Sequence, residues 1–348
     1  MKHLKLLALA LIAALSFASC DNDEIPEGDP NILVLNNGNW GANDANILGY
    51  DSRTDTSMPF LFKKANGQQL GDLGQDIIAV GDKLYIAVNG SQVIFVTDRD
   101  LHIIERIEAT ANDTRLSPRS LCCVDKKVYV TYYEGYLGEI NTKDYSVRTT
   151  AVGNSPEGLA YADGRIFVAN SGGALYPDYD KTISVVDAKS FTEVQKIDVN
   201  LNPQNIVASA DGRSLYVNSF GNYADVPALV QCISIDGADY SVSSLEYTDV
   251  KAITAGKDND LYVVTGGYDE NWQVQGTVNV YNMKDRKQTA VFPDAIANFY
   301  SISYSGGNVF VGTSDYQTNG DVYMYDRTGL RLATFDAQGL NPQKVIRL

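Results

Sequence analysis

Aromatic side chains gather in six loop-like segments of the sequence, together with Asn, Gln and Asp. The segments are residues 36–46, 132–136, 170–181, 219–228, 265–276 and 313–320. The rings that we select from them are Trp40, Tyr132, Tyr133, Tyr176, Phe220, Tyr223, Tyr268, Trp272 and Tyr316. Flat apolar faces with amide donors and acceptors between them can bind a broad ligand of mixed polarity. The alternative is that each ring only packs its loop against a neighbour.

A second set of polar residues occupies one position of a repeated motif. The strings LNPQNI (201–206) and LNPQKV (340–345) bring Gln204 and Gln343 into register. Aligning the other copies completes a set of Gln75, Arg119, Glu157, Gln204, Lys251, Tyr300 and Gln343. All seven can form hydrogen bonds, so we interpret them as the floor of a binding site. The alternative is a water-filled channel mouth that simply tolerates polar side chains.

Motifs for catalysis and metal binding are scarce. Beyond the N-terminal segment the chain has one histidine, His102, which argues against Ser-His-Asp catalysis and against a histidine-ligated zinc or iron site. No phosphate-cradling glycine loop is found. The Asp-rich segments 176–181 and 315–321 have no defined calcium-loop spacing, so solvated loops are the simpler interpretation. We therefore expect a binding protein with no catalytic residues, no resident cofactor and no metal.

The elements that would position both sets recur along the chain. An apolar strand, a turn of Gly, Asp or Asn, and a second strand form the unit, and the second strands begin at Ile32, Leu84, Val128, Ile166, Leu215, Leu261 and Val309. A third and a fourth strand follow, and four strands in a repeat of about 40–50 residues are typical of a β-propeller blade. We expect an all-β, seven-bladed β-propeller over residues 32–348, with four antiparallel strands per blade. Six or eight blades are the alternative.

The two ends of the repeat array are incomplete in complementary ways. The copy at Ile32 lacks a first strand before it, and residues 340–348 lack a second strand after them. We expect the C-terminal strand to join the N-terminal blade and close the ring, which removes edges that would otherwise stay unpaired. Loops between second and third strands then share one face, called here the top face, with the channel mouth.

The N-terminal residues read as a targeting segment. Residues 1–20 have a basic start, an apolar run and small residues before Cys20, which is the pattern of a secretory signal. The ending FASC resembles a lipobox, in which Cys20 would be lipidated. Residues 21–31 are a polar, flexible tether, and their acidic residues resemble the surface-export signal of Bacteroidota lipoproteins. The prediction is a lipid-anchored outer-membrane protein that faces the cell exterior.

Charge argues against a nucleic-acid-binding protein, and cysteine content argues against a disulfide-rich one. The formal net charge of −15 is opposite in sign to that of a nucleic-acid binder. Cys122, Cys123 and Cys232 are odd in number and give no disulfide framework. We expect all three cysteines to be small buried side chains.

Several blade strings resemble the YncE-like seven-bladed propellers over the whole mature chain. They are PEGLAYADGRIFVAN (156–170), NPQNIVASADGRSLYVNS (202–219) and ISVVDAKSFTEVQKI (183–197). Together with the lipoprotein signal, the chain resembles the BtuG-type surface lipoproteins of Bacteroidota. That resemblance implies capture of cobalamin or a related corrinoid, as a transported ligand, and its delivery to a TonB-dependent outer-membrane transporter. The alternatives are a surface propeller that binds a glycan, peptide or partner protein, and a lactonase- or lyase-type propeller enzyme.

Overall fold

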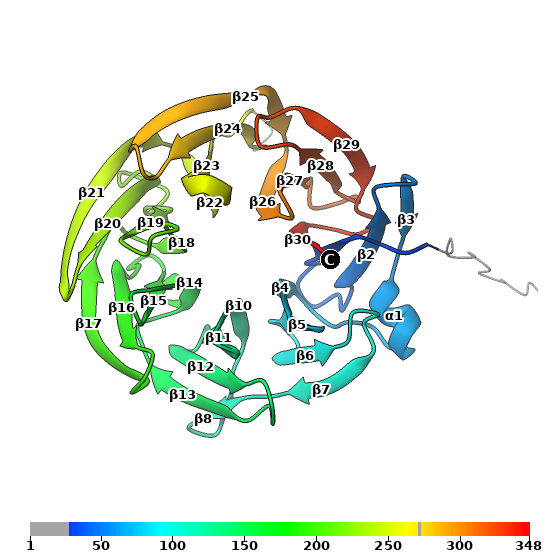
Figure 1. Cartoon of the computed structure of the whole chain (residues 1–348), viewed down its shortest axis with the longest axis horizontal. Helices are drawn as coiled ribbons and strands as arrows, with labels where there is room; N and C mark the ends of the chain where they lie inside the picture. Colours follow the sequence, from blue (N-terminus) through cyan, green and yellow to red (C-terminus); the bar gives the residue numbers. More distant parts are fainter. Residues whose placement is uncertain (1–27, 271–272) are drawn as a thin grey trace, which may run out of the picture.

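Seven four-stranded antiparallel sheets stand around a central channel in the computed structural model, which describes residues 28–270 and 273–348 (Figure 1). The strands of each sheet are called A to D from the channel outwards. The predicted seven-bladed β-propeller is therefore confirmed. Among the described residues, no helix has the length and apolar character needed to cross a bilayer.

Strand A lines the channel and strand B pairs with it. The A strands are β4 (Gly74–Val80), β10 (Pro118–Val124), β14 (Pro156–Ala162), β18 (Pro203–Ala208), β22 (Val250–Ala255), β26 (Phe299–Ser305) and β30 (Pro342–Arg347). The B strands are β5 (Lys83–Val88), β11 (Lys127–Tyr132), β15 (Arg165–Asn170), β19 (Ser214–Ser219), β23 (Asp260–Thr265), β27 (Asn308–Thr313) and β1 (Ile32–Asn36).

Strands C and D complete each blade towards the rim. The C strands are β6 (Val93–Thr97), β12 (Tyr136–Asn141), β16 (Thr182–Asp187), β20 (Leu229–Asp236), β24 (Gln275–Asn282), β28 (Asp321–Tyr325) and β2 (Asn46–Asp51). The D strands are β7 (Ile103–Ile107), β13 (Val147–Ala151), β17 (Thr192–Asp198), β21 (Asp239–Thr248), β25 (Lys287–Ala297), β29 (Arg331–Asp336) and β3 (Thr56–Met58). A short helix, α1 (Leu61–Asn66), and a small hairpin of β8 (Thr110–Ala111) and β9 (Thr114–Arg115) lie in connections between blades.

The hydrophobic core lies between neighbouring blades. Leu35 and Ile47 of one blade pack in the same cluster as Ile77 and Ile86 of the next. Strands B and C are buried on both faces because a blade covers each face, whereas the outer strand β17 exposes every residue except Ile197. This is why the inner strands read as continuous apolar runs and the fourth strands do not.

The ring is closed by the two ends of the described chain. Strand β30 pairs with β1, with Leu33 opposite Ile346 and Val34 opposite Val345, and the red and blue ends of the chain meet in Figure 1. The other edge of β30 meets serines of β26: Val345 N–H donates to Ser303 Oγ at 3.2 Å and Arg347 N–H donates to Ser305 Oγ at 2.9 Å. The expected closing strand is confirmed and is bonded on both sides.

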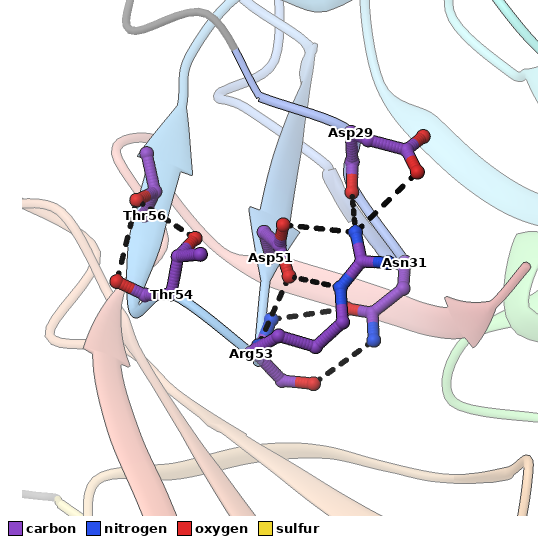
Figure 2. A network of polar contacts seen from close by, with 7 residues as sticks. Asp29, Asn31, Asp51, Arg53, Thr54 and Thr56 are labelled. Atoms are coloured by element: carbon purple, nitrogen blue, oxygen red, sulfur yellow. Dashed lines mark hydrogen bonds and ion pairs between the residues drawn. The ribbon is translucent and has the colours of Figure 1, made fainter.

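The chain enters the propeller on the face opposite the B–C loops, called here the bottom face. Figure 2 shows Arg53, in the turn between β2 and β3, bonding to Asp51 and to Asp29. Asn31 exchanges two hydrogen bonds of 3.0 Å with Ser52. Because β1 starts beside the end of β30, Leu348 N–H also reaches the Asn31 carbonyl at 3.0 Å. The entering segment is therefore attached to the bottom of the first blade.

The cysteine prediction is only partly correct. Cys232 is buried, Cys122 is half-buried and Cys123 is exposed. Cys122 and Cys123 are adjacent in β10, so their side chains alternate between the two faces of the strand. The prediction failed for Cys123 because its side chain lies on the solvent-facing side of β10, although its neighbours in the sequence are apolar.

Candidate ligand-binding site on the top face

One backbone hydrogen bond recurs in all seven blades and fixes the site. The N–H of the residue that follows strand B donates to a carbonyl just before strand A of the same blade, at 2.8–3.1 Å. The donors are Asn37, Asn89, Tyr133, Ser171, Phe220, Gly266 and Ser314, and the acceptors are Asn341, Leu73, Ser117, Ser155, Asn202, Asp249 and Asn298. All acceptors except Ser117 have a positive φ, between 46° and 62°. The start of each B–C loop is thereby held against the start of strand A.

The next feature is a β-bulge at the start of every strand A. In β4, Gly74 pairs with Val88 and Asp76 with Ala87, so Gln75 is the extra residue. The same irregularity includes Lys251 in β22, between the pairs of Val250 and Ala252, and corresponding shifts occur in the other five blades. A bulge re-aims the side chain that it carries. The seven polar residues selected from the sequence all lie at these bulges.

All seven of these residues line one cavity at the top mouth of the channel. Its volume is about 480 Å³, and Phe220 contributes to the wall. The structure therefore brings the set together: this cavity is lined by Gln75, Arg119, Glu157, Gln204, Lys251, Tyr300 and Gln343. That they contact a ligand stays a prediction.

Two ion pairs neutralise most of the charge in the cavity. Arg119 Nε donates to Glu157 Oε2 at 2.7 Å, and its Nη1 donates to Gln75 Oε1 at 2.9 Å. Deeper in the channel, Lys344 Nζ lies 3.6 Å from Asp76 Oδ1. Burial raises the pKa of the Tyr300 phenol, which therefore stays protonated and able to donate at neutral pH.

Lys251 differs from the other cations of the cavity. Its Nζ lies 4.2 Å from the centroid of the Tyr268 ring, which is a cation–π geometry. No carboxylate lies within ion-pair distance of Lys251 in the described part of the chain. Burial lowers the pKa of Lys251, although the charge of Asp249 acts in the opposite direction.

Above the cavity the B–C loops form an aromatic rim that we call the tyrosine collar, comprising Tyr133, Tyr179, Tyr223, Tyr268 and Tyr316. The Tyr179 and Tyr223 rings meet edge to face at 6.2 Å between centroids. The Tyr316 ring lies 5.8 Å, between centroids, from the ring of Tyr300, which lines the cavity below. The Tyr133 ring lies 5.6 Å from the Arg119 guanidinium carbon. Tyr223 and Tyr316 are 65% and 64% exposed, so their faces are open to a ligand.

Of the remaining predicted aromatics, Phe220 lines the cavity, whereas Trp40 and Tyr176 do not. Trp40 is 81% exposed in the loop after β1, and Tyr176, 72% exposed, contacts the Tyr179 ring at 5.9 Å. Phe220 meets Tyr223 at 6.4 Å. Trp272 lies outside the described residues.

The expectation that Tyr132 is a loop aromatic at the site was wrong, whereas Tyr133 lies above the cavity beside Arg119. Tyr132 is the last residue of β11, pairs with Tyr136 of β12 and is only 1% exposed. Its ring packs in the core with Val130, so it is not a surface aromatic. The loop is a tight turn, because Gly135 takes a φ of 93° that a larger residue rarely adopts.

Sequence reasoning also missed two charged side chains, Asp76 and Lys344, that line the cavity beside the seven polar residues. Asp76 and Lys344 come directly after Gln75 and Gln343, and simple strand alternation would point them away from the channel. The bulge breaks this alternation, so both side chains reach the cavity. A repeated polar pair at the start of strand A was the available signal.

His102 lies on the bottom face. It follows the turn between β6 and β7, and Asp98 and Asp100 lie beside it, with their ligand atoms all within 4.8 Å of one another. Both acids are exposed or half-exposed. This group is far from the top-face cavity and contributes nothing to it.

Comparisons with known proteins give a family and similar solved structures. The family model described as "Domain of unknown function (DUF5074)" matches residues 31–307. A solved structure titled "Kuenenia stuttgartiensis Hydrazine Synthase" is similar with a TM-score of 0.57 and 17% identity, over 71% of this chain and 74% of that one. A chain of "Crystal Structure of Mitotic Checkpoint Complex" has a TM-score of 0.57 and 14% identity, over 96% and 89%. None of the curated proteins compared with the chain matches it. At such identities the structures share the fold alone.

Proposed function

The chain belongs to the DUF5074 family, whose description assigns no function, and from this premise we propose that it is a surface lipoprotein that captures cobalamin or a related corrinoid. The ligand would bind at the top-face cavity. It would then pass to a TonB-dependent outer-membrane transporter. In this proposal the protein is not an enzyme and holds no cofactor of its own.

The observation that carries the proposal is the tyrosine collar above the polar cavity. A corrin is broad and flat, and it is fringed with primary amides. Aromatic faces such as those of Tyr223 and Tyr316 suit the flat ring, while Gln75, Gln204 and Gln343 offer amide partners. The volume of about 480 Å³ suits part of such a ligand, and the rest would lie between the loops.

The position of the N-terminal segment is compatible with surface attachment. Residues from Asp29 onwards are bonded to the bottom of the first blade. A lipid on Cys20, which lies outside the described residues, would therefore leave the opposite face directed away from the membrane. The resemblance to YncE-like propellers and to the BtuG-type lipoproteins supports corrinoid capture at the cell surface.

The ligand would be held without a protein ligand to cobalt. His102 lies on the bottom face, and the cavity is lined by Gln, Arg, Glu, Lys and Tyr side chains at the ring positions. None of these is a usual replacement for the ligand's own base. The visible spectrum of the corrinoid should therefore stay that of its own axial ligation, and a histidine-type shift would contradict this part.

Calorimetric titration with cyanocobalamin tests the proposal. We expect saturable binding of one ligand per chain, with a Kd below about 10 µM. No heat at micromolar protein would reject corrinoid capture. Heat with a glycan or peptide, and none with cyanocobalamin, would favour the alternative that the same rim binds another surface ligand. Neighbouring genes for a cobalamin transporter would support the delivery step.

A further inference from the structure

The cavity has an uncompensated positive charge in a strongly acidic protein. Its titratable walls are Asp76, Lys344, Arg119, Glu157, Tyr300 and Lys251. Arg119 is paired with Glu157 at 2.7 Å and Lys344 with Asp76 at 3.6 Å. Tyr300 is neutral at pH 7, and burial raises its pKa further. Lys251 is left as the one charge on these walls that forms no ion pair in the described part of the chain, although Asp249 acts on it from outside the cavity lining and the whole chain has a net charge of −15.

The environment of Lys251 leaves its donors available. An ammonium group has three N–H donors. The Tyr268 ring faces the ammonium at 4.2 Å, but none of these donors has a hydrogen-bond partner among residues 28–270 and 273–348. Burial makes this charge costly in the free protein, as its lowered pKa indicates. A cation held at such a cost in a cavity is well placed to gain from an anionic partner.

The backbone fixes where this charge points. Lys251 is the bulged residue at the start of β22, and Asp249 two residues earlier accepts the repeated hydrogen bond from Gly266 at 3.1 Å. Tyr268 lies just beyond Gly266 in the same loop. This hydrogen bond therefore holds the start of β22, which carries Lys251, against the start of the loop that carries Tyr268.

We infer that Lys251 forms an anion subsite in the top-face cavity, which binds a phosphate or carboxylate oxygen of the ligand. This inference rests on the proposed function, because the ligand is expected in the same cavity. Tyr300 and Gln204 border the subsite as neutral donors. With a corrinoid the anionic group is the phosphodiester of the nucleotide loop; with an acidic glycan or peptide it is a carboxylate.

Small anions test the subsite without assuming a corrinoid. The lysines of the purified protein are labelled with ¹³C-methyl groups, and the Lys251 signal is identified by its loss in Lys251→Arg. Sodium phosphate and sodium acetate are then titrated at constant ionic strength. We expect a saturable shift of the Lys251 signal, with the stronger response identifying phosphate or carboxylate as the preferred group. A shift that is no larger than that of Lys143, in the bottom-face turn after β12, would overturn the inference.

Two corrinoids, one with and one without the phosphate, then test the phosphate contact separately from corrinoid binding as a whole. Lys251→Gln should weaken cyanocobalamin binding about tenfold or more, since a partly desolvated charge pair is lost, but should change the affinity for cobinamide, which lacks the phosphate, less than about threefold. Lys143→Gln removes the same charge and should change neither. Equal losses for both corrinoids would overturn the phosphate contact. A Lys251 response to phosphate in a protein that does not bind cyanocobalamin would keep the subsite and reject the corrinoid.

Discussion

The guanidinium of Arg119 and the carboxylate of Glu157 join two neighbouring blades across the mouth of the channel, at 2.7 Å. Their side chains are 23% and 12% exposed, so the charges are shielded from water. Removing one partner of a buried pair leaves the other uncompensated, and this costs more than removing both.

Arg119→Met should therefore lower the free energy of unfolding by about 2 kcal/mol, after allowance for the partial exposure. The double variant Arg119→Met/Glu157→Gln should recover most of the loss. Urea unfolding at pH 7 measures both. The exposed pair of Arg106 and Glu108, at 2.7 Å, is the matched control, and its Arg106→Met variant should lose less than about 0.5 kcal/mol. Equal losses in the single and double variants at the mouth would contradict the coupling.

The tyrosine collar should contribute directly to ligand affinity. Tyr223→Ala and Tyr316→Ala each remove an exposed ring above the cavity, and each should weaken cyanocobalamin binding about fivefold to tenfold with little change in stability. Tyr145→Ala, in the turn before β13 on the other face, should leave the affinity unchanged. Calorimetric titration measures the three affinities. Unchanged affinity in both collar variants would show that the ligand does not bind at the top face.

Glu139 should give the fold a defined pH dependence. It accepts hydrogen bonds from Arg148 at 2.9 and 3.0 Å and from Lys127 at 3.0 Å. Burial alone would raise its pKa, but these bonds outweigh burial and lower it. Glu139→Gln should cost about 1 kcal/mol at pH 7.

The direction of this pH dependence follows from the pKa of Glu139 in the folded and in the unfolded state. Because the folded pKa is the lower one, the stabilisation is complete above the unfolded value of about 4.3 and is lost as pH falls through the folded value. Urea unfolding of both proteins between pH 7 and pH 3 should show the difference shrinking towards acid pH. A difference that grows on acidification would contradict the assignment.

The closing strand depends on serines of the preceding blade. Ser303→Ala and Ser305→Ala remove acceptors for the Val345 and Arg347 N–H groups, and each should lower the stability by about 1 kcal/mol. Ser243→Ala on the exposed strand β21 should lose less than about 0.5 kcal/mol. Deleting residues 342–348 should abolish the single cooperative transition, and unchanged unfolding after that deletion would refute closure by β30.

The attachment of the entering segment can be tested separately from global stability. Hydrogen bonds from Arg53 lower the pKa of Asp51 to about 2, so the contact persists down to strongly acidic pH. Arg53→Gln should increase amide hydrogen exchange in residues 29–32 while leaving the urea midpoint unchanged. A shift of the midpoint without faster local exchange would contradict a purely local role.

The fold could be predicted from the sequence because each blade repeats two strong local signals. Asp163 and Gly164 adopt the positive φ values that a tight hairpin needs, and the apolar runs mark strands covered on both faces. The shared cavity of the seven polar residues followed from the alignment of strand A. These features depend on nearest neighbours in the chain, which a sequence displays directly.

The rest depends on contacts that a sequence does not display. Tyr132 looks like a loop aromatic, yet the ladder between β11 and β12 extends one residue further and buries it. The ion pair of Lys344 with Asp76 joins β30 to β4, two strands that lie far apart in the sequence. Whether Lys251 has a counter-charge depends on the other six blades, and no local pattern reveals this.

The pairing of β30 with β1 also determines when the first blade can be completed during synthesis of the chain. The Asn36 side chain donates to the Ala337 carbonyl across 301 residues, and contacts of such long range form slowly. While the ribosome is still making the last blades, the first blade has no innermost strand and presents an unpaired edge. An unpaired edge of this kind favours aggregation, so the first blade is protected only after residues 342–347 have been made and β30 has paired with β1.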